Sequence, residues 1–204
     1  MLLSINPINP QERLIRKVVD VLQNEGIIIY PTDTVYGLGC SIFSKRAMKR
    51  LYQIKKVNQK KPFTFICSNQ TQLQKYTQGI PADVFKMLRR KLPGPYTFVF
   101  KASKIVPKMM LSPRNTLGLR WPDHPIANEI VSSFGHPILS SSLRISKDQL
   151  YEDPHDIHKN YKKLVDLIVD GGSIFAENST IIDFSSGGAK ISRIGKGPVD
   201  WLSR

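Results

Sequence analysis

The sequence contains no long apolar run and very little cysteine. No apolar run in its 204 residues approaches the roughly 18 residues that a membrane-spanning helix needs. The two cysteines, Cys40 and Cys67, are too few for a disulfide framework and form no Cys-x-x-Cys pair. We therefore expect both to be reduced and packed as small hydrophobic side chains. The first residues show no basic stretch before an apolar region, so we expect no secretory signal and a cytoplasmic location.

Acidic residues are nearly absent from the middle of the chain. Between Thr34 and Pro122 there are 18 Lys and Arg residues and one acid, Asp83. The whole chain has 30 Lys and Arg against 16 Asp and Glu, a net charge of +14, and residues 1–110 hold all of this excess. Such a basic field attracts phosphate, either as nucleotide or as nucleic acid. The alternative is a soluble basic surface that has no partner.

Several common catalytic patterns are also missing. The four histidines show no zinc-type spacing with the cysteines, so no metal site is predicted. The chain has no Gly-Lys-Ser/Thr core of a Walker A loop and no Gly-x-Ser-x-Gly elbow, so we predict no catalytic nucleophile. What is present, 41% hydrophobic residues without a dividing linker, predicts one globular domain over residues 1–204.

Apolar periodicity predicts alternating helices and strands. Helices are expected after Pro10, after Ser44, after Pro81 and over 125–134. Strands are expected at 27–30, 63–67, 96–100, 116–120, 138–139, 167–169 and 180–183. This order indicates a single-domain α/β or α+β fold around a mixed sheet, and it excludes a helical bundle or an all-β barrel.

The stretch from Tyr30 to Cys40 carries the most chemistry. It places two hydroxyls (Thr32 and Thr34), the Asp33 carboxylate and two glycines directly after an apolar strand. The glycines suit tight turns or a close approach of the backbone. Polar groups at the end of such a strand are typical of a ligand site, and a local turn capped by the carboxylate is an equally good interpretation.

Four further segments carry groups that suit anions. The lysines at 55–62 are able to form a cradle for phosphates. Taken without the rest of the sequence, this segment is better interpreted as a solvated loop. Arg120 ends a strand, where it suits a carboxylate or phosphate, or else a structural pair with Asp123. Hydroxyls follow a strand at 140–142, and residues 178–183 are followed by an Arg-x-Gly at 193–195.

Together these segments resemble the YrdC-like family of threonylcarbamoyl-AMP synthases, and most of all its short YciO subgroup. The family motif Pro-Thr-Asp/Glu-Thr-Val-Tyr-Gly-Leu is matched from Pro31 to Leu38, and Arg-x-Pro-x-His-Pro is matched at 120–125. Residues 179–183 match Ser-Thr-(Ile/Val)-(Ile/Val)-Asp, and 193–195 match Arg-x-Gly.

The resemblance implies a twisted mixed sheet, flanked by helices, with a concave basic face. It implies an enzyme that joins L-threonine, bicarbonate and ATP, with Mg²⁺, into threonylcarbamoyl-AMP and pyrophosphate for the t6A modification of tRNA. The L-threonine contacts that it implies are Thr34, Arg120 and Ser179. The ATP contacts that it implies are Lys55, Lys61, Thr116, Ser142 and Arg193.

Two positions depart from the family pattern. Val57 replaces an arginine and Arg144 replaces an asparagine, and Lys56, Lys60 or Arg144 are the cations that would compensate. The losses favour an alternative function, a nucleotide-, tRNA- or double-stranded RNA-binding protein with weak or no synthase activity. The residues predicted to contact nucleic acid are Lys45, Arg46, Lys49, Arg50, Lys56 and Lys60.

Overall fold

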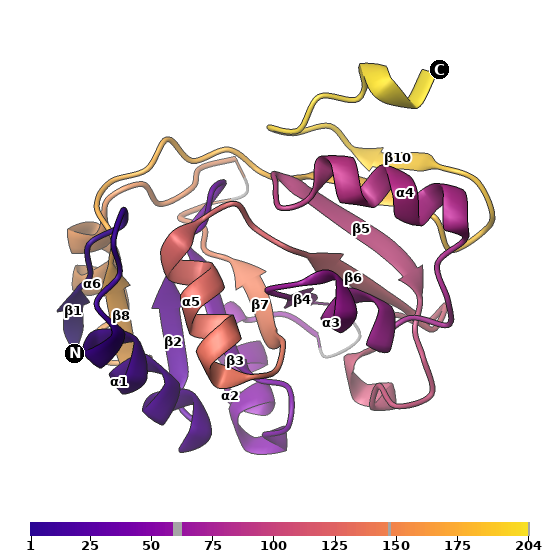
Figure 1. Cartoon of the computed structure of the whole chain (residues 1–204). Coiled ribbons are helices and arrows are strands. Elements are labelled where there is room, and N and C mark those ends of the chain that lie inside the picture. The colour runs from indigo at the N-terminus through magenta and orange to yellow at the C-terminus, as the bar shows by residue number, and fades with distance from the viewer. Residues whose placement is uncertain (59–62, 147, 204) are drawn as a thin grey trace.

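The structure, a computed structural model, describes residues 1–58, 63–146 and 148–203 (Figure 1). Its centre is a mixed sheet with the strand order β1-β8-β2-β3-β7-β4-β6-β5-β9-β10. The strands are β1 (Leu2–Ser4), β2 (Ile27–Tyr30), β3 (Gly37–Ser41), β4 (Thr64–Ile66), β5 (Tyr96–Lys101), β6 (Thr116–Arg120), β7 (Ile138–Ser142), β8 (Leu167–Asp170), β9 (Thr180–Asp183) and β10 (Lys190–Arg193). The helices are α1 (Glu12–Gln23), α2 (Lys45–Lys55), α3 (Gln70–Lys75), α4 (Ala82–Lys91), α5 (Pro125–Phe134) and α6 (Pro154–Tyr161), with short 3₁₀ turns η1 (Lys108–Met110) and η2 (Asp200–Ser203). The predicted mixed α/β fold is therefore confirmed.

Residues 31–36 form the loop between β2 and β3, and the two glycines lie in β3. The alternative of a local turn capped by Asp33 is wrong about the cap, because the Thr34 and Val35 N–H groups donate to Thr32 Oγ1 while Asp33 binds Arg120.

β2 and β3 pair in antiparallel fashion, and the buried Tyr30 ring lies against the two glycines of β3. A Cβ atom at Gly39 would lie 2.9 Å from Tyr30 Cε1, and one at Gly37 would lie 3.0 Å from Tyr30 Cζ. The glycines therefore serve close packing and not a tight turn.

Besides β3 and the two 3₁₀ turns, four short elements were not predicted: β1, α3, α6 and β10. Strand β1 has three residues, too few to show a period, and it forms because β8 offers a parallel partner at the sheet edge. Helix α6 begins with Pro154 after Asp153, whose carboxylate accepts a hydrogen bond from the His155 backbone N–H. That signal was present in the sequence as an acidic residue before a proline at the first helical position.

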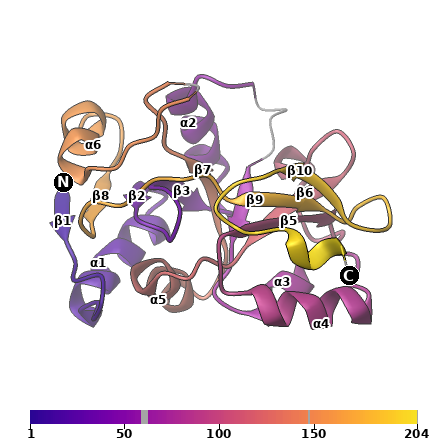
Figure 2. The same cartoon turned by 90° about the horizontal axis from the view of Figure 1, so that it is seen from above.

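Alternating strand residues divide the core into two clusters. Ile28 and Tyr30 of β2 face one side and pack with α1 and α5, while Ile27 and Ile29 face the other side and share a cluster with α2. Figures 1 and 2 show α1 and α5 side by side on one side of the sheet, with α2 and α6 on the other. The two cysteines are free and buried, as predicted for packed side chains, and burial raises the pKa of the Cys40 thiol to about 12.

The strand register brings polar residues from distant segments onto one sheet face. In β7, Ser140 pairs with Gly39 of β3 and with Thr64 of β4, and Thr64 in turn pairs with Gly118 of β6. Paired residues project to the same face of the sheet, and Ile138, two residues before Ser140 in β7, lies on that face beneath α1 and α5. Along β7 this face changes from the apolar Ile138 to the polar Ser140, and its polar part forms the site.

Candidate functional site: a cationic cavity

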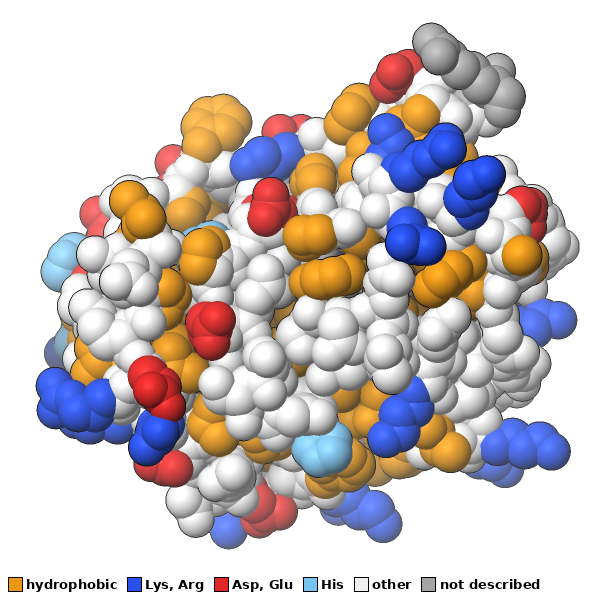
Figure 3. All heavy atoms as spheres, in the orientation of Figure 1, with side chains coloured by type: hydrophobic (Ala, Val, Ile, Leu, Met, Phe, Trp, Pro, Cys, Tyr) orange, Lys and Arg blue, Asp and Glu red, His pale blue; other side chains and the backbone are white. Residues whose placement is uncertain are grey.

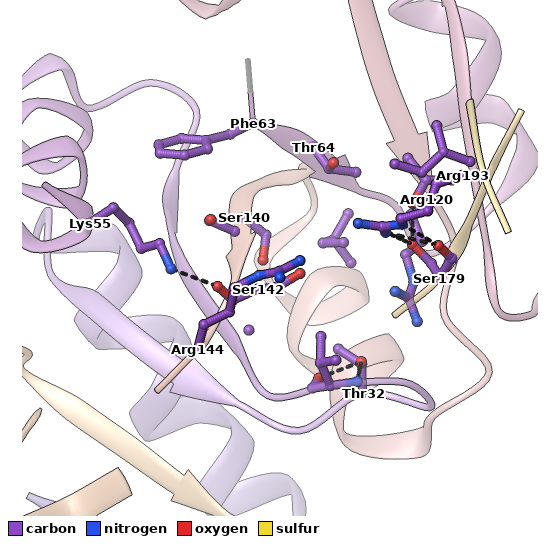
Figure 4. A pocket seen from close by; sticks show the side chains of 16 residues that line it. Thr32, Lys55, Phe63, Thr64, Arg120, Ser140, Ser142, Arg144, Ser179 and Arg193 are labelled. Atoms are coloured by element: carbon purple, nitrogen blue, oxygen red, sulfur yellow. Dashed lines mark hydrogen bonds between the residues drawn. The ribbon is translucent and has the colours of Figure 1, made fainter. Parts of the chain in front are cut away.

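A cavity of about 470 Å³ lies on this polar part of the sheet (Figure 4). Its lining comes from residues that span almost the whole chain: Thr32, Val35, Gly37, Lys55, Phe63, Thr64, Ile66, Thr97, Arg120, Ser140, Ser141, Ser142, Arg144, Ser179, Ile181 and Arg193. Four of these side chains are cationic, and within the described part of the chain none of the lining residues is Asp or Glu. The cavity therefore favours an anionic ligand.

One end of the cavity contains a buried ion pair. Arg120, at the end of β6, binds Asp33, and the side chains are only 6% and 12% exposed. The sequence neighbour Asp123 is exposed, so the alternative pair with that residue is wrong. Among the described residues, Asp33 Oδ2 and Arg120 Nε have no protein partner although both atoms are buried. Arg120 also lines the cavity, so its guanidinium is the charged group at this end.

A serine is fixed beside this ion pair by an arginine from a later strand. Arg193 donates from Nε and Nη2 to the Ser179 carbonyl oxygen (3.0 and 2.8 Å), and its Nη2 also lies 3.1 Å from Ser179 Oγ. Ser179 Oγ is 2.9 Å from Thr97 Oγ1. Gly195 permits this arrangement, because a Cβ there would lie 2.0 Å from the Asn178 carbonyl oxygen.

The other end is formed where α2 meets the end of β7. Lys55, the last residue of α2, donates its ammonium to the Ser142 carbonyl oxygen at 2.8 Å. Two residues later, Arg144 donates from Nη2 to Asn178 Oδ1 at 2.9 Å. Figure 4 shows Lys55, Ser142 and Arg144 on one side of the cavity, with Arg120, Ser179 and Arg193 on the opposite side.

The three guanidinium groups are close enough to influence one another. The pKa of Arg193 lies below its ordinary value, first because the group is buried and then because Arg144 and Arg120 repel its charge. Like charges gathered in one cavity are stabilised when an anion lies between them. The electrostatics therefore agree with the composition of the lining.

His124 is the residue that precedes α5. Its pKa is lowered by burial, which outweighs the opposing effects of Asp33 and Asp123. In the part of the chain that the structure describes, its Nδ1 is buried without a hydrogen-bond partner. The neutral ring therefore adds no charge to a site that is already cationic.

The structure brings most of the predicted ligand residues together. Arg120, Ser179, Lys55, Ser142 and Arg193 all line the cavity. Their individual roles stay predictions.

Two predicted residues do not reach the described lining. Thr34 is fully buried, with its Oγ1 3.3 Å from that of the lining residue Thr32, and Thr116 is buried at the start of β6 against Ser112. Lys60 and Lys61 lie outside the described residues.

Of the residues predicted to contact nucleic acid, Lys45, Arg46, Lys49 and Arg50 lie in α2. Lys45 and Lys49 are exposed, and Arg46 is exposed with Glu25 at 4.0 Å. Arg50 is instead a structural contact, because it donates to Asp166 (2.6 Å) and to the Leu164 carbonyl oxygen (2.8 Å). Lys56 is exposed in a left-handed conformation after the helix.

Sequence reasoning assigned no role to Thr64 and Thr97, which line the cavity. It placed Thr32 and Asn178 in candidate segments without a specific contact, and the structure has Thr32 in the lining and Asn178 bound to Arg144. Polar residues that alternate with apolar ones in 63–67 and 96–100 were the available signal, since they mark a sheet face that is not packed in the core. That signal becomes specific only when the strand order is known.

The described residues contain no group of three or more His, Cys, Asp and Glu side chains arranged to hold a metal ion. Among the helices that the structure describes, none is long and apolar enough to span a membrane.

The fold and the site define a mixed α/β protein with a cationic cavity on one face of its sheet. The chain belongs to the Sua5/YciO/YrdC family, whose model, described as telomere recombination, matches residues 20–195. This family places it in the threonylcarbamoyl-AMP synthase superfamily.

Three relatives show how similar the chain is to known proteins. It is 37% identical to Escherichia coli YciO over 197 residues, which cover 96% of this chain and 95% of YciO. The E. coli YciO structure superposes with a TM-score of 0.93 and 98% coverage of both chains. A Coxiella burnetii threonylcarbamoyl-AMP synthase is 32% identical over 157 residues, 77% of this chain and 84% of that protein. P. abyssi Sua5 complexed with L-threonine has a TM-score of 0.92 and 25% identity, over 100% of this chain and 60% of Sua5.

Proposed function

We propose that this protein condenses L-threonine, bicarbonate and ATP into threonylcarbamoyl-AMP and releases pyrophosphate, for the t6A modification of tRNA. The observation that carries the proposal is the convergence of Lys55, Arg120, Arg144 and Arg193 on one cavity whose described lining has no carboxylate. Relatives named threonylcarbamoyl-AMP synthase and a Sua5 structure complexed with L-threonine support it.

The end around Arg120 suits the amino acid. An arginine fork binds a carboxylate through two parallel hydrogen bonds, and Asp33 holds this fork in place from behind. The hydroxyls of Thr32 and Ser179 line the same cavity and are able to contact the polar groups of L-threonine. Thr34 would act through Thr32, which its side chain contacts.

The end around Lys55 suits the phosphates of ATP. In the reaction, the threonine nitrogen forms a bond to the carbon of bicarbonate and water leaves, which gives a carbamate. A carbamate oxygen then bonds to the α-phosphorus, and the bond from that phosphorus to the pyrophosphate oxygen breaks. Both reactants are anions, so cations that hold them together supply the catalysis without a nucleophilic side chain.

Mg²⁺ would enter with the nucleotide. Within the described lining there is no carboxylate to hold the ion, whereas phosphate oxygens bind Mg²⁺ well. The chain's own contribution is then to position the phosphates with Lys55, Ser142 and Arg193.

The test is pyrophosphate release from ATP, measured with L-threonine and bicarbonate added together and then each omitted. We expect release only when both are present. Ser179→Ala should lower the rate, whereas Ser186→Ala, the same change at an exposed position in the loop after β9, should leave it unchanged. Absence of release at an enzyme concentration equal to that of ATP would overturn the proposal.

RNA binding is a second candidate function. The observation that favours it is the outer face of α2, where Lys45, Arg46 and Lys49 are exposed around a surface hollow. Helix α2 runs about 15 Å from Lys45 to Lys55, and Lys55 itself lines the cavity. A basic surface on the helix that also reaches an anion site suits a nucleic-acid backbone.

A further inference from the structure

An exposed aromatic side chain lies next to the basic face of α2. Phe43, in the turn between β3 and α2, is 63% exposed although it is a large apolar residue. Its ring meets the exposed ring of His136 edge to face, with the ring centroids 4.9 Å apart and an interplanar angle of 87°. His136 in turn meets the half-buried Phe134 edge to face at 6.0 Å. Phe43, His136 and Phe134 therefore form an aromatic platform at the surface.

The strand register holds this platform together. β3 and β7 pair in antiparallel fashion with Ser41 opposite Ile138, so the segment that leaves β3 and the segment that enters β7 lie at the same end of the sheet (Figure 1). The Phe43 backbone N–H donates to Ser41 Oγ at 3.2 Å, and Pro137 restricts the backbone of the residue before it, His136. Both rings are thus attached to ordered backbone, so less conformational entropy is lost when a ligand stacks on them.

The geometry of the ring pair leaves aromatic surface for a flat ligand. When two rings meet at nearly a right angle, each keeps at least one face that the other does not cover. A single exposed apolar residue is common on proteins and by itself indicates nothing. What distinguishes Phe43 is that its ring lies beside cations. A nucleobase stacks on an aromatic face, whatever the base, and its phosphates need the cations.

The charges beside the platform suit the backbone of such a ligand. Lys45 follows Phe43 by two residues, and Lys45, Arg46 and Lys49 are exposed along α2. Glu25 is an acid near this surface, 4.0 Å from Arg46, and it offsets one of these charges. The sum of these four charges stays positive, which attracts phosphate.

We propose that Phe43 stacks against an unpaired base of an RNA whose backbone lies along the basic face of α2. The inference rests on RNA binding, the second candidate function, and it specifies the class of RNA. A fully paired A-form duplex keeps its bases stacked inside the helix, so it would contact the lysines and not the ring. Unpaired nucleotides at a loop, a bulge or an end present bases that stack on an aromatic side chain.

The experiment measures the fluorescence anisotropy of two labelled RNAs titrated with the full chain: a blunt duplex and the same duplex extended by a short run of unpaired uridines. The extended RNA should bind roughly tenfold more tightly, the effect of stacking a base on an aromatic ring. Phe43→Ala should remove this gain and leave the affinity for the blunt duplex unchanged, whereas Phe43→Trp should retain the gain. Phe175→Ala is the matched control, because it removes a phenylalanine that is 81% exposed in the segment between β8 and β9.

Salt separates stacking from charge. The affinity lost in Phe43→Ala should be the same at every salt concentration, because a base stack releases no counterions, whereas Lys45→Ala should make the salt dependence shallower. If the wild type shows no gain for the extended RNA, or if Phe43→Ala shows the same gain, the inference is overturned while RNA binding itself stands. If neither RNA binds the wild type even at low salt, RNA binding fails and the inference fails with it. A self-association that depends on Phe43 would then assign the platform to a protein contact.

Discussion

At the scale of single residues, the ion pair of Arg120 and Asp33 fixes the cationic side chain at one end of the cavity. The two residues lie 87 positions apart, and both side chains are nearly buried. Sequence reasoning identified Arg120 and offered Asp123, three residues later, as its partner in the structural alternative, because proximity along the chain is the only proximity that a sequence displays. The fold instead brings the loop after β2 to the end of β6.

Asp33→Asn should destabilise the protein by about 3–5 kcal/mol, because it leaves the Arg120 charge buried without its counterion. Urea denaturation followed by circular dichroism measures this change. The matched control is Asp123→Asn, an exposed carboxylate three residues from the same arginine, which should change stability by less than about 0.5 kcal/mol. Equal effects of the two variants would contradict the assignment of Asp33 as the partner.

At the scale of elements, the contact between β2 and β3 explains a motif that the sequence left open. Gly37 and Gly39 leave space for the Tyr30 ring, whose hydroxyl donates to Ser140 Oγ of β7 at 2.7 Å. One tyrosine thus connects three neighbouring strands beside the cavity. The two glycines were compatible with a turn or with close packing, and only the partner strand decides between them.

Gly39→Ala should destabilise the protein by about 1–3 kcal/mol, since its Cβ would lie 2.9 Å from Tyr30 Cε1 in a packed core. The measurement is again the urea midpoint. Tyr30→Leu removes the ring, so the cost of the alanine should shrink when both changes are combined. Strictly additive effects of the two substitutions would show that the ring is not the obstacle.

Elements with a clear apolar period were predictable, and several elements without one were not. Helix α1 and strands such as β5 show several repeats of their period, and they form where the apolar pattern placed them. Strands β1 and β10 are short, lie at the two ends of the sheet order and depend on a single neighbour. Their hydrogen-bond partners are distant in sequence or across a turn, which no local pattern reveals.

At the scale of the whole molecule, the positive charge occupies more than one surface. Part of it lines the cavity, and part covers the outer face of α2. A further group of Lys and Arg side chains gathers over α4, whose Lys86, Arg89 and Arg90 are exposed (Figure 3). Of the four cations in the described lining, Lys55 alone belongs to residues 1–110, so the excess charge of that segment contributes one side chain to the cavity and several to the outer faces of α2 and α4.

If RNA binds through α2, its affinity should fall steeply with salt, and Lys45→Ala with Lys49→Ala should make that slope shallower. Each lost phosphate contact reduces the slope of log affinity against log salt by about 0.7–0.9. Fluorescence anisotropy with a labelled double-stranded RNA at several salt concentrations measures it. Arg89→Ala with Arg90→Ala is the control with equal charge loss. A slope that changes only in the α4 variant would assign the contact to α4 instead.

The sequence by itself determined the fold class, the longer elements, the family motifs and the basic character of the ligand site, because these depend on local periodicity, composition and motif order. Only the tertiary structure decided which residues meet. Strand register places Thr64 beside Ser140. The loop after β2 brings Asp33 into contact with Arg120, and Asn178 accepts a hydrogen bond from Arg144, which lines the cavity. Such contacts arise from the pairing of segments far apart in the chain, and local sequence carries no record of that pairing.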